Sequence, residues 1–113
     1  MPDAAQGNIL DFRVLYLTTI GRRSGLPREI ETWFVACNGK LYLLAEHFHR
    51  AHWVRNIERN PRVRVGGRGW SATARVLDEE RDRETWQRAQ KLARHRYGWG
   101  DGLPVEITPD EPF

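Results

Sequence analysis

EIETWFVACNGKLYLLA, residues 29–45, contains the strongest structural signal in the chain. Two runs rich in β-branched, aromatic and aliphatic residues, 29–37 and 41–45, flank Asn38-Gly39. This dipeptide strongly favours a two-residue hairpin turn, because both of its residues tolerate a positive φ. The stretch therefore predicts two antiparallel strands joined by a tight turn.

Outward from this hairpin, the remaining elements follow from periodicity and from turn residues. FRVLYLTT, residues 12–19, predicts a strand buried on both faces. Asn60-Pro61 ends a short helix over 49–59, because the residue before a proline avoids helical backbone. Asp78 is the expected N-cap of a second helix. The other predicted elements are a hairpin of strands 62–66 and 70–77 around a Gly66–Gly69 turn, the second helix over 79–95, and a last strand over 103–107.

The predicted order is β, ββ, α, ββ, α, β, with hairpins in place of helical crossovers, so the strands should pair antiparallel. The fold class is mainly β with helices (α+β): a small antiparallel barrel or sheet carrying two helices. A length of 113 residues suits one domain over 1–113, with residues 1–8 loosely held.

Composition excludes several classes of protein. A single cysteine, Cys37, excludes an internal disulfide framework and a cysteine zinc site. No apolar run approaches the roughly 20 residues of a membrane span, and no signal peptide is seen, so a cytoplasmic domain is expected. Of 18 basic residues only Lys40 and Lys91 are lysines, but a net charge of +3 is too small to argue for nucleic acid. Five tryptophans indicate a buried core, a ligand pocket or a subunit interface, and the last of these favours a homodimer.

The segment GRRSG, residues 21–25, followed by Arg28, is a candidate anion site. Glycines let the backbone approach a ligand, and Arg22 and Arg23 offer forked donors. A solvated basic turn explains the same residues. No GK[ST] pair opens a helix here, so the segment is not a P-loop.

Glu46, His47, His49 and His52 form a second cluster, whose residue types suit Zn²⁺ or iron. Histidines at a strand end are more often polar rim residues, or donors to a bound anion or ring, and no metal site is predicted.

Aromatic and amide side chains make up the remaining candidates. Trp53 and Asn56 lie three residues apart on one helix, where Trp53 is either a core anchor or a pocket wall and Asn56 can pair with a heterocycle edge. Tyr97 and Trp99 form either an aromatic flap or the packing around a helix C-cap. No nucleophile–base pair or carboxylate dyad is evident. Together these residues indicate a pocket for a flat, anionic ligand.

These motifs resemble a known family. LTTIGRRSGLPR, the strand ending at Asn38-Gly39, KLYLLA and HWVRNIERNPRVRV are together similar to the deazaflavin (F420)-dependent nitroreductase/quinone reductase family, over about residues 15–80. The resemblance implies a split β-barrel of the FMN-binding superfamily. It also implies F420H₂ as the hydride donor to a nitroaromatic, a quinone or an enone.

Carried over position by position, the resemblance implies that the loop of Arg22, Arg23, Ser24 and Gly25 holds the phosphate and acidic tail of F420. Further positions implied or favoured for the cofactor are Arg28, Ala45, His47, Trp53 and Asn56, and those for the acceptor are Tyr97 and Trp99. The acceptor would receive its proton from Tyr97, a histidine or water.

The chain departs from the family pattern after Ala45, where Glu46–His52 replaces a longer Ser-Lys-Gly-Gly segment. FMN is therefore the alternative cofactor. The alternative functions are a non-catalytic split-barrel binding module, haem included, and an arginine-faced nucleic-acid barrel using Arg62, Arg64, Arg68 and Arg75.

Overall fold

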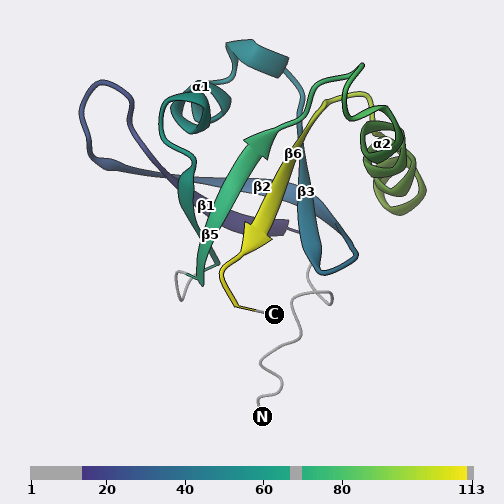
Figure 1. Ribbon diagram of the computed structural model, residues 1–113, viewed down its shortest axis with the longest axis horizontal. Helices are drawn as coiled ribbons and strands as arrows, with labels where there is room; N and C mark the ends of the chain where they lie inside the picture. Colours follow the sequence, from purple (N-terminus) through teal and green to yellow (C-terminus); the bar gives the residue numbers. More distant parts are fainter. Residues whose placement is uncertain (1–13, 67–69, 112–113) are drawn as a thin grey trace.

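The computed structural model describes residues 14–66 and 70–111. It contains six strands and two α-helices in the predicted order, together with a 3₁₀ turn at Phe48–Arg50 (Figure 1). The elements are β1 Val14–Ile20, β2 Pro27–Cys37, β3 Lys40–Ala45, α1 His52–Arg59, β4 Arg62–Val65, β5 Trp70–Val76, α2 Arg83–Tyr97 and β6 Leu103–Pro109. The predicted loose segment 1–8, Phe12 and Arg68 lie outside the described residues. No helix in the described ranges is long and apolar enough to cross a membrane.

The strands close into one antiparallel barrel in the order β1-β2-β3-β6-β5-β4. The central hairpin forms as predicted: Asn38 and Gly39 take φ values of 54° and 77°, and Cys37 pairs with Lys40. Two positive φ values in succession match the backbone twist of the flanking strands. The antiparallel barrel with two helices predicted from the sequence is confirmed.

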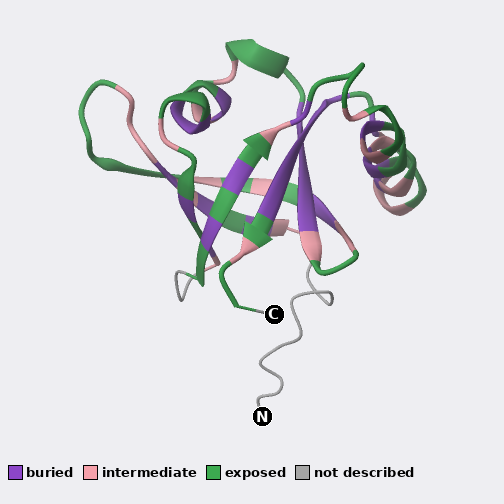
Figure 2. Cartoon of the chain, viewed as in Figure 1, coloured by how far each residue is buried: buried purple, intermediate pink, exposed green. Residues whose placement is uncertain are grey.

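Burial differs between the two sides of the barrel, as Figure 2 shows. β3 and β6 are buried along most of their length because the barrel interior covers one face and α2 covers the other. β1 is different: Leu15 and Leu17 point into the core, whereas Tyr16 is 45% exposed on the outer face. The prediction that this strand is buried on both faces was wrong, because Tyr16 lies beside Glu31 on the outer face of the barrel and stays exposed to solvent.

Both helices begin later than the sequence predicted. The first starts at His52, because residues 48–50 form the 3₁₀ turn, in which Phe48 takes a φ of 52°. The second starts at Arg83 with Asp82 as its N-cap residue. Asp78 instead accepts the backbone N–H groups of Glu80 and Arg81, both at 2.9 Å, and so caps the preceding turn. These bonds lower the pKa of the Asp78 carboxyl.

A polar network lies beneath α2 on the outer face of the barrel. Glu106, 8% exposed, accepts the hydroxyl of Tyr42 at 3.0 Å and contacts Arg75 and Lys40 at 3.4 and 3.6 Å. Burial, with the charge of Glu106 next, raises the pKa of Tyr42 to about 12. Every buried side-chain polar atom in the described part of the chain has a hydrogen-bond partner. The network therefore leaves no buried polar side chain unsatisfied on this side of the barrel.

Candidate functional site

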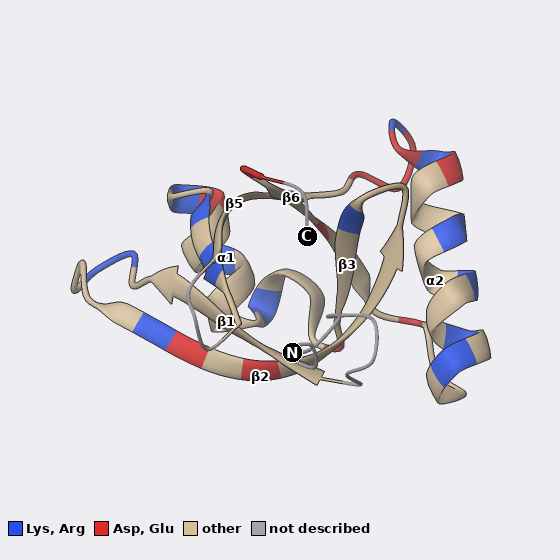
Figure 3. Cartoon of the chain, turned by 90° about the horizontal axis from the view of Figure 1, so that it is seen from below, with Lys and Arg blue, Asp and Glu red and all other residues tan. Residues whose placement is uncertain are grey.

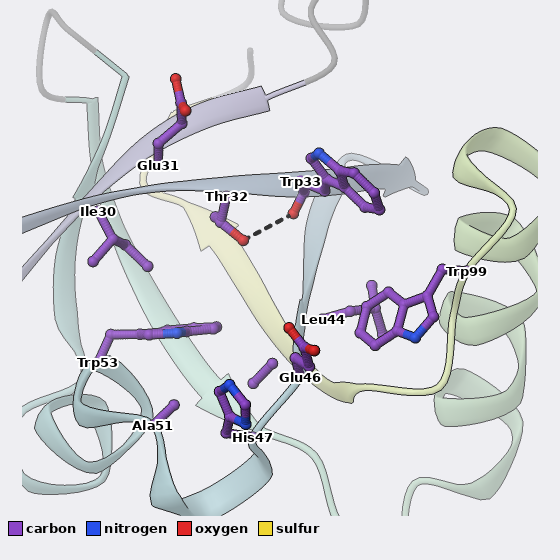
Figure 4. A pocket seen from close by; sticks show the side chains of 11 residues that line it. Ile30, Glu31, Thr32, Trp33, Leu44, Glu46, His47, Ala51, Trp53 and Trp99 are labelled. Atoms are coloured by element: carbon purple, nitrogen blue, oxygen red, sulfur yellow. Dashed lines mark hydrogen bonds between the residues drawn. The ribbon is translucent and has the colours of Figure 1, made fainter.

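The open half of β2 provides one wall of the site. β2 has 11 residues but pairs with β3 only from Phe34 onward, and within the described ranges residues 27–33 pair with β1 alone. The carbonyl oxygen of Trp33 on this free edge accepts the hydroxyl of Thr32 at 3.4 Å (Figure 4). A free sheet edge leaves backbone donors and acceptors available to a ligand.

The loop of residues 21–26 closes on itself through backbone bonds. The N–H of Gly21 donates to the carbonyl of Leu26 at 2.8 Å, and that of Gly25 to the carbonyl of Gly21 at 2.9 Å. The hydroxyl of Ser24 accepts the N–H of Leu26 at 3.1 Å and a guanidinium N–H of Arg28 at 3.5 Å. These bonds give the loop that carries the arginines a defined conformation.

Asn56 on α1 attaches this loop to the barrel. Its side chain is only 4% exposed; its oxygen accepts the backbone N–H of Arg22 at 3.2 Å and the Arg22 guanidinium at 2.9 Å. Its amide donates to the hydroxyl of Thr19 at 3.1 Å. Arg22 also contacts the ring Nδ1 of His52 at 3.2 Å. Asn56 therefore organises the loop through Arg22.

A cavity with positively charged walls lies where the loop meets α1, and we call it the arginine pocket. Its volume is about 400 Å³, and its charged walls are Arg22, Arg23 and Arg28. Within the ranges that the structure describes, none of the three pairs with a carboxylate. Burial, followed by the charges of Arg55 and Arg23, lowers the pKa of Arg22. Such a cluster attracts phosphate or carboxylate. The cavity is lined by Thr19, Gly21, Arg22, Arg23, Ser24, Arg28, Ile30, His52, Trp53 and Asn56.

A second cavity, which we call the ring pocket, lies between α1 and the C-terminal end of α2 (Figure 4). Its volume is about 570 Å³. The lining comes from β2, from the end of β3 and the segment after it, from the start of α1 and from Trp99. These residues are Ile30, Glu31, Thr32, Trp33, Leu44, Ala45, Glu46, His47, Ala51, Trp53 and Trp99.

Trp33 and Trp99 form the α2 side of the ring pocket, and Tyr97 packs against Trp33. The ring of Trp33 stacks on Tyr97 at 4.6 Å between centroids and meets Trp99 edge-on at 6.5 Å. Trp99 also lies against Gly102, where an added Cβ would be 2.8 Å from its ring and 2.9 Å from the carbonyl oxygen of Ala45. The aromatic wall is thus held from two sides.

The two pockets adjoin, since Ile30 and Trp53 line both. Together they make a trough with a cationic end and an aromatic end. The side chains of this trough fit F420. The arginines suit its phosphate and carboxylates, and the tryptophan-lined end suits its flat ring.

Most of the predicted site residues come together in this trough. Arg22, Arg23, Ser24, Arg28 and Asn56 line the arginine pocket, Ala45, His47 and Trp99 line the ring pocket, and Trp53 lines both. Gly25 lines neither cavity and instead gives the loop its positive φ of 72°. Tyr97 also lines neither cavity, and its ring stacks on the ring of Trp33.

The contribution of β2 to the site was not predicted from the sequence. Ile30, Thr32 and Trp33 line the ring pocket, yet they were assigned only to a strand. One signal was available: Trp33 follows Glu29 and Glu31 on the same strand face, where an apolar side chain is out of place unless something covers it.

The histidines after β3 diverge. His47 faces the ring pocket, His49 pairs with Glu58 at 3.0 Å, and His52 contacts Arg22. No group of three metal-ligating side chains converges in the described part of the chain.

The hairpin arginines are also engaged elsewhere. Arg62 makes bonds of 3.0 and 2.6 Å to Asp110, and Arg75 contacts Asp82 and Glu106. The arginine face required for nucleic acid is thus partly neutralised.

Comparison with known proteins identifies the relatives of this fold. The family model for F420H(2)-dependent quinone reductase matches residues 3–108. No curated protein matches the chain. The chain is similar to a solved F420-H2 dependent reductase, FDR-A, with 31% identity over 84% of this chain and 92% of that one, at a TM-score of 0.60.

Two further solved structures share the fold. HutZ, the haem storage protein from Vibrio cholerae, has 21% identity over 97% of this chain and 89% of its own, at a TM-score of 0.74. A domain-swapped dimer has 28% identity over 88% of this chain and 82% of its own, at a TM-score of 0.57. The barrel is a split β-barrel of the FMN-binding type.

Proposed function

Because the chain belongs to the F420H(2)-dependent quinone reductase family, we propose that it is an oxidoreductase that passes hydride from F420H₂ to a small, flat, electron-poor acceptor. The acceptor classes are nitroaromatics, quinones and enones. When bound, F420H₂ supplies the hydride. The observation that carries the proposal is the continuity of a cationic and an aromatic pocket across Trp53.

The arginine pocket would hold the anionic part of the cofactor. Arg23 and Arg28 extend from the loop end, while Arg22 is committed to Asn56 and His52. We therefore assign the binding of phosphate and carboxylates chiefly to Arg23 and Arg28, with Ser24 at the same loop. Arg22 and Asn56 would position the loop.

The ring pocket would hold flat groups between Trp53 and the wall of Trp33 and Trp99. Apolar walls exclude water, which favours hydride transfer over side reactions. The hydroxyl of Tyr97 already donates to the carbonyl of Phe34, so His47 at the pocket is better placed to hold the proton that the acceptor requires.

Titration with F420, followed by tryptophan quenching, tests the assignment. Arg23→Ala/Arg28→Ala should weaken F420 binding by roughly a hundredfold or more, because each of the two charge-assisted contacts contributes about 1.5–3 kcal/mol. Arg64→Ala/Arg83→Ala removes the same charge outside both pockets and should leave the affinity unchanged. Equal affinities of wild type and Arg23→Ala/Arg28→Ala would overturn the anion site. Saturable binding of FMN, with no binding of F420, would show that FMN and not F420 is the cofactor.

A second candidate is a non-catalytic binding module of the same barrel, with haem as ligand. The likeness to HutZ in fold and the placement of His47 in the ring pocket support it. A haem absorption band that shifts on binding to the wild type but not to His47→Ala is the expected signature of this alternative.

We further propose a cytoplasmic homodimer. Its support is the exposure of large aromatic side chains, Tyr16 at 45%, Trp33 at 44% and Trp70 at 42%, together with the solved domain-swapped dimer of similar fold. Light scattering during size exclusion should give about twice the 13.2 kDa of one chain.

A further inference from the structure

Charge is divided between the two halves of the trough. The arginine pocket has three guanidinium groups and one histidine, and no carboxylate residue lines it among the described residues. The ring pocket has Glu31, Glu46 and His47, and the described lining includes no lysine or arginine. Figure 3 shows a related contrast on β2, whose free half has a basic band next to the loop and acidic bands further along the strand.

Only one of the two carboxylates faces the ring pocket. In Figure 4 the Glu31 side chain points away from the cavity. It interacts with Tyr16 on the outer face, where its charge raises the pKa of the Tyr16 hydroxyl. The carboxylate of Glu46 lies between Trp53 and Trp99 in the same view (Figure 4). Within the described ranges Glu46 forms no ion pair.

Aromatic walls beside a carboxylate are the features that attract an organic cation. The faces of indole rings carry negative potential and bind ammonium groups, and a nearby carboxylate adds a charge. Trp33, Trp53 and Trp99 supply three indoles around the cavity that Glu46 faces. On the α2 side, Arg96 lies 5.3 Å from the centroid of Tyr97, and neither residue lines the ring pocket.

We propose that the ring pocket selects its acceptor by charge: it accepts aromatic rings that are cationic or neutral and rejects anionic ones, and Glu46 is the specificity-determining residue. The inference rests on the proposed function, which places flat groups in this pocket, and it concerns the acceptor among them. It adds a class of substrate and a residue to which no role has been assigned.

The expected effect follows from Coulomb's law. A carboxylate about 6 Å from a ligand charge, at an effective dielectric between that of a protein surface and that of water, changes affinity by roughly tenfold. The carboxylate raises the affinity for a cation and lowers the affinity for an anion. The ratio of their dissociation constants should therefore exceed that single factor.

Three matched nitroaromatics test the proposal: 4-nitrobenzyltrimethylammonium, 4-nitrobenzyl alcohol and 4-nitrobenzenesulfonate. Each quenches tryptophan fluorescence, so binding is measured on the full chain without F420. The wild type should bind the cation most tightly and the sulfonate most weakly. Glu46→Gln removes both effects and should reduce the cation-to-anion affinity ratio by more than tenfold. Glu84→Gln, which removes the same charge on the exposed face of α2, should leave the ratio unchanged.

Two results would overturn the inference: equal binding of the three probes by the wild type, or an unchanged ratio in Glu46→Gln. Because Glu46 is exposed, the variant should fold, and its unfolding temperature checks this. The outcome is separate from that of the F420 titration. Charge selection without F420 binding would contradict the proposed cofactor alone, whereas F420 binding without charge selection would contradict the role of Glu46 alone.

Discussion

The hydroxyl of Tyr97 bonds to both backbone polar groups of Phe34. It accepts the Phe34 N–H at 3.3 Å and donates to the Phe34 carbonyl at 2.6 Å, across 63 residues of sequence. Phe34 is where β2 begins to pair with β3, and Trp33, immediately before it, stacks on the Tyr97 ring. One side chain therefore attaches the end of α2 to the strand that forms the free edge of the ring pocket.

Replacing Tyr97 with phenylalanine keeps the ring stacked on Trp33 but removes both hydrogen bonds. Because the Phe34 backbone groups are buried, we expect a loss of about 1–3 kcal/mol in the free energy of unfolding. Denaturant unfolding measures this, and hydrogen exchange at the Phe34 amide should become faster. An unchanged exchange rate at that amide would contradict the bond.

Gly102→Ala tests the support of Trp99 from the other side. The new Cβ would lie 2.8 Å from the Trp99 ring and 2.9 Å from the Ala45 carbonyl, so the ring has to move. We expect a loss of about 1–3 kcal/mol of stability and a changed tryptophan emission. Gly39→Ala is the control, because its Cβ has open space and only the φ of 77° is strained. Identical emission from Gly102→Ala and the wild type would be inconsistent with this packing.

Asn56→Ala should release the loop that carries the arginines. The change removes the acceptor of two Arg22 bonds and the donor to Thr19, so we expect about 2 kcal/mol of destabilisation and faster exchange at the Arg22 amide. Asn60→Ala is the matched control, because Asn60 accepts one exposed bond from the N–H of Arg62. If the two variants lose equal stability, Asn56 does not attach the loop as described.

Tyr42 makes stability fall at alkaline pH. Its pKa rises to about 12 in the folded chain, against about 10 when unfolded, so the unfolded chain releases this proton first. The contribution is fully present below pH 10 and is lost as the pH rises through about 12. A shift of this size corresponds to about 2–3 kcal/mol.

Urea unfolding of wild type and Tyr42→Phe at pH 8, 10 and 11.5 measures this contribution. Phenylalanine cannot ionise, so the variant should lose less stability than the wild type between pH 10 and 11.5. Parallel losses in the two proteins would assign the alkaline effect to other groups.

Local sequence determined the strands, the hairpin turn and the arginine loop, because each depends on neighbouring residues. Asn38-Gly39 takes its positive φ values by intrinsic preference, and alternating apolar positions define the barrel strands. The motif residues Arg23, Ser24 and Trp53 were also predicted from the sequence, and the structure places them in one trough.

Only the tertiary structure decided which of those residues are free for a ligand. The sequence did not distinguish Arg22 from Arg23 and assigned Asn56 to a heterocyclic ligand, but contacts between residues 34 positions apart commit Arg22 and Asn56 to each other. Trp33 became a pocket wall because β3 pairs with β2 only beyond it and α2 returns Tyr97 beside it. Closure of the barrel and docking of the helix are long-range events, and a local pattern does not determine which face of a strand they leave uncovered.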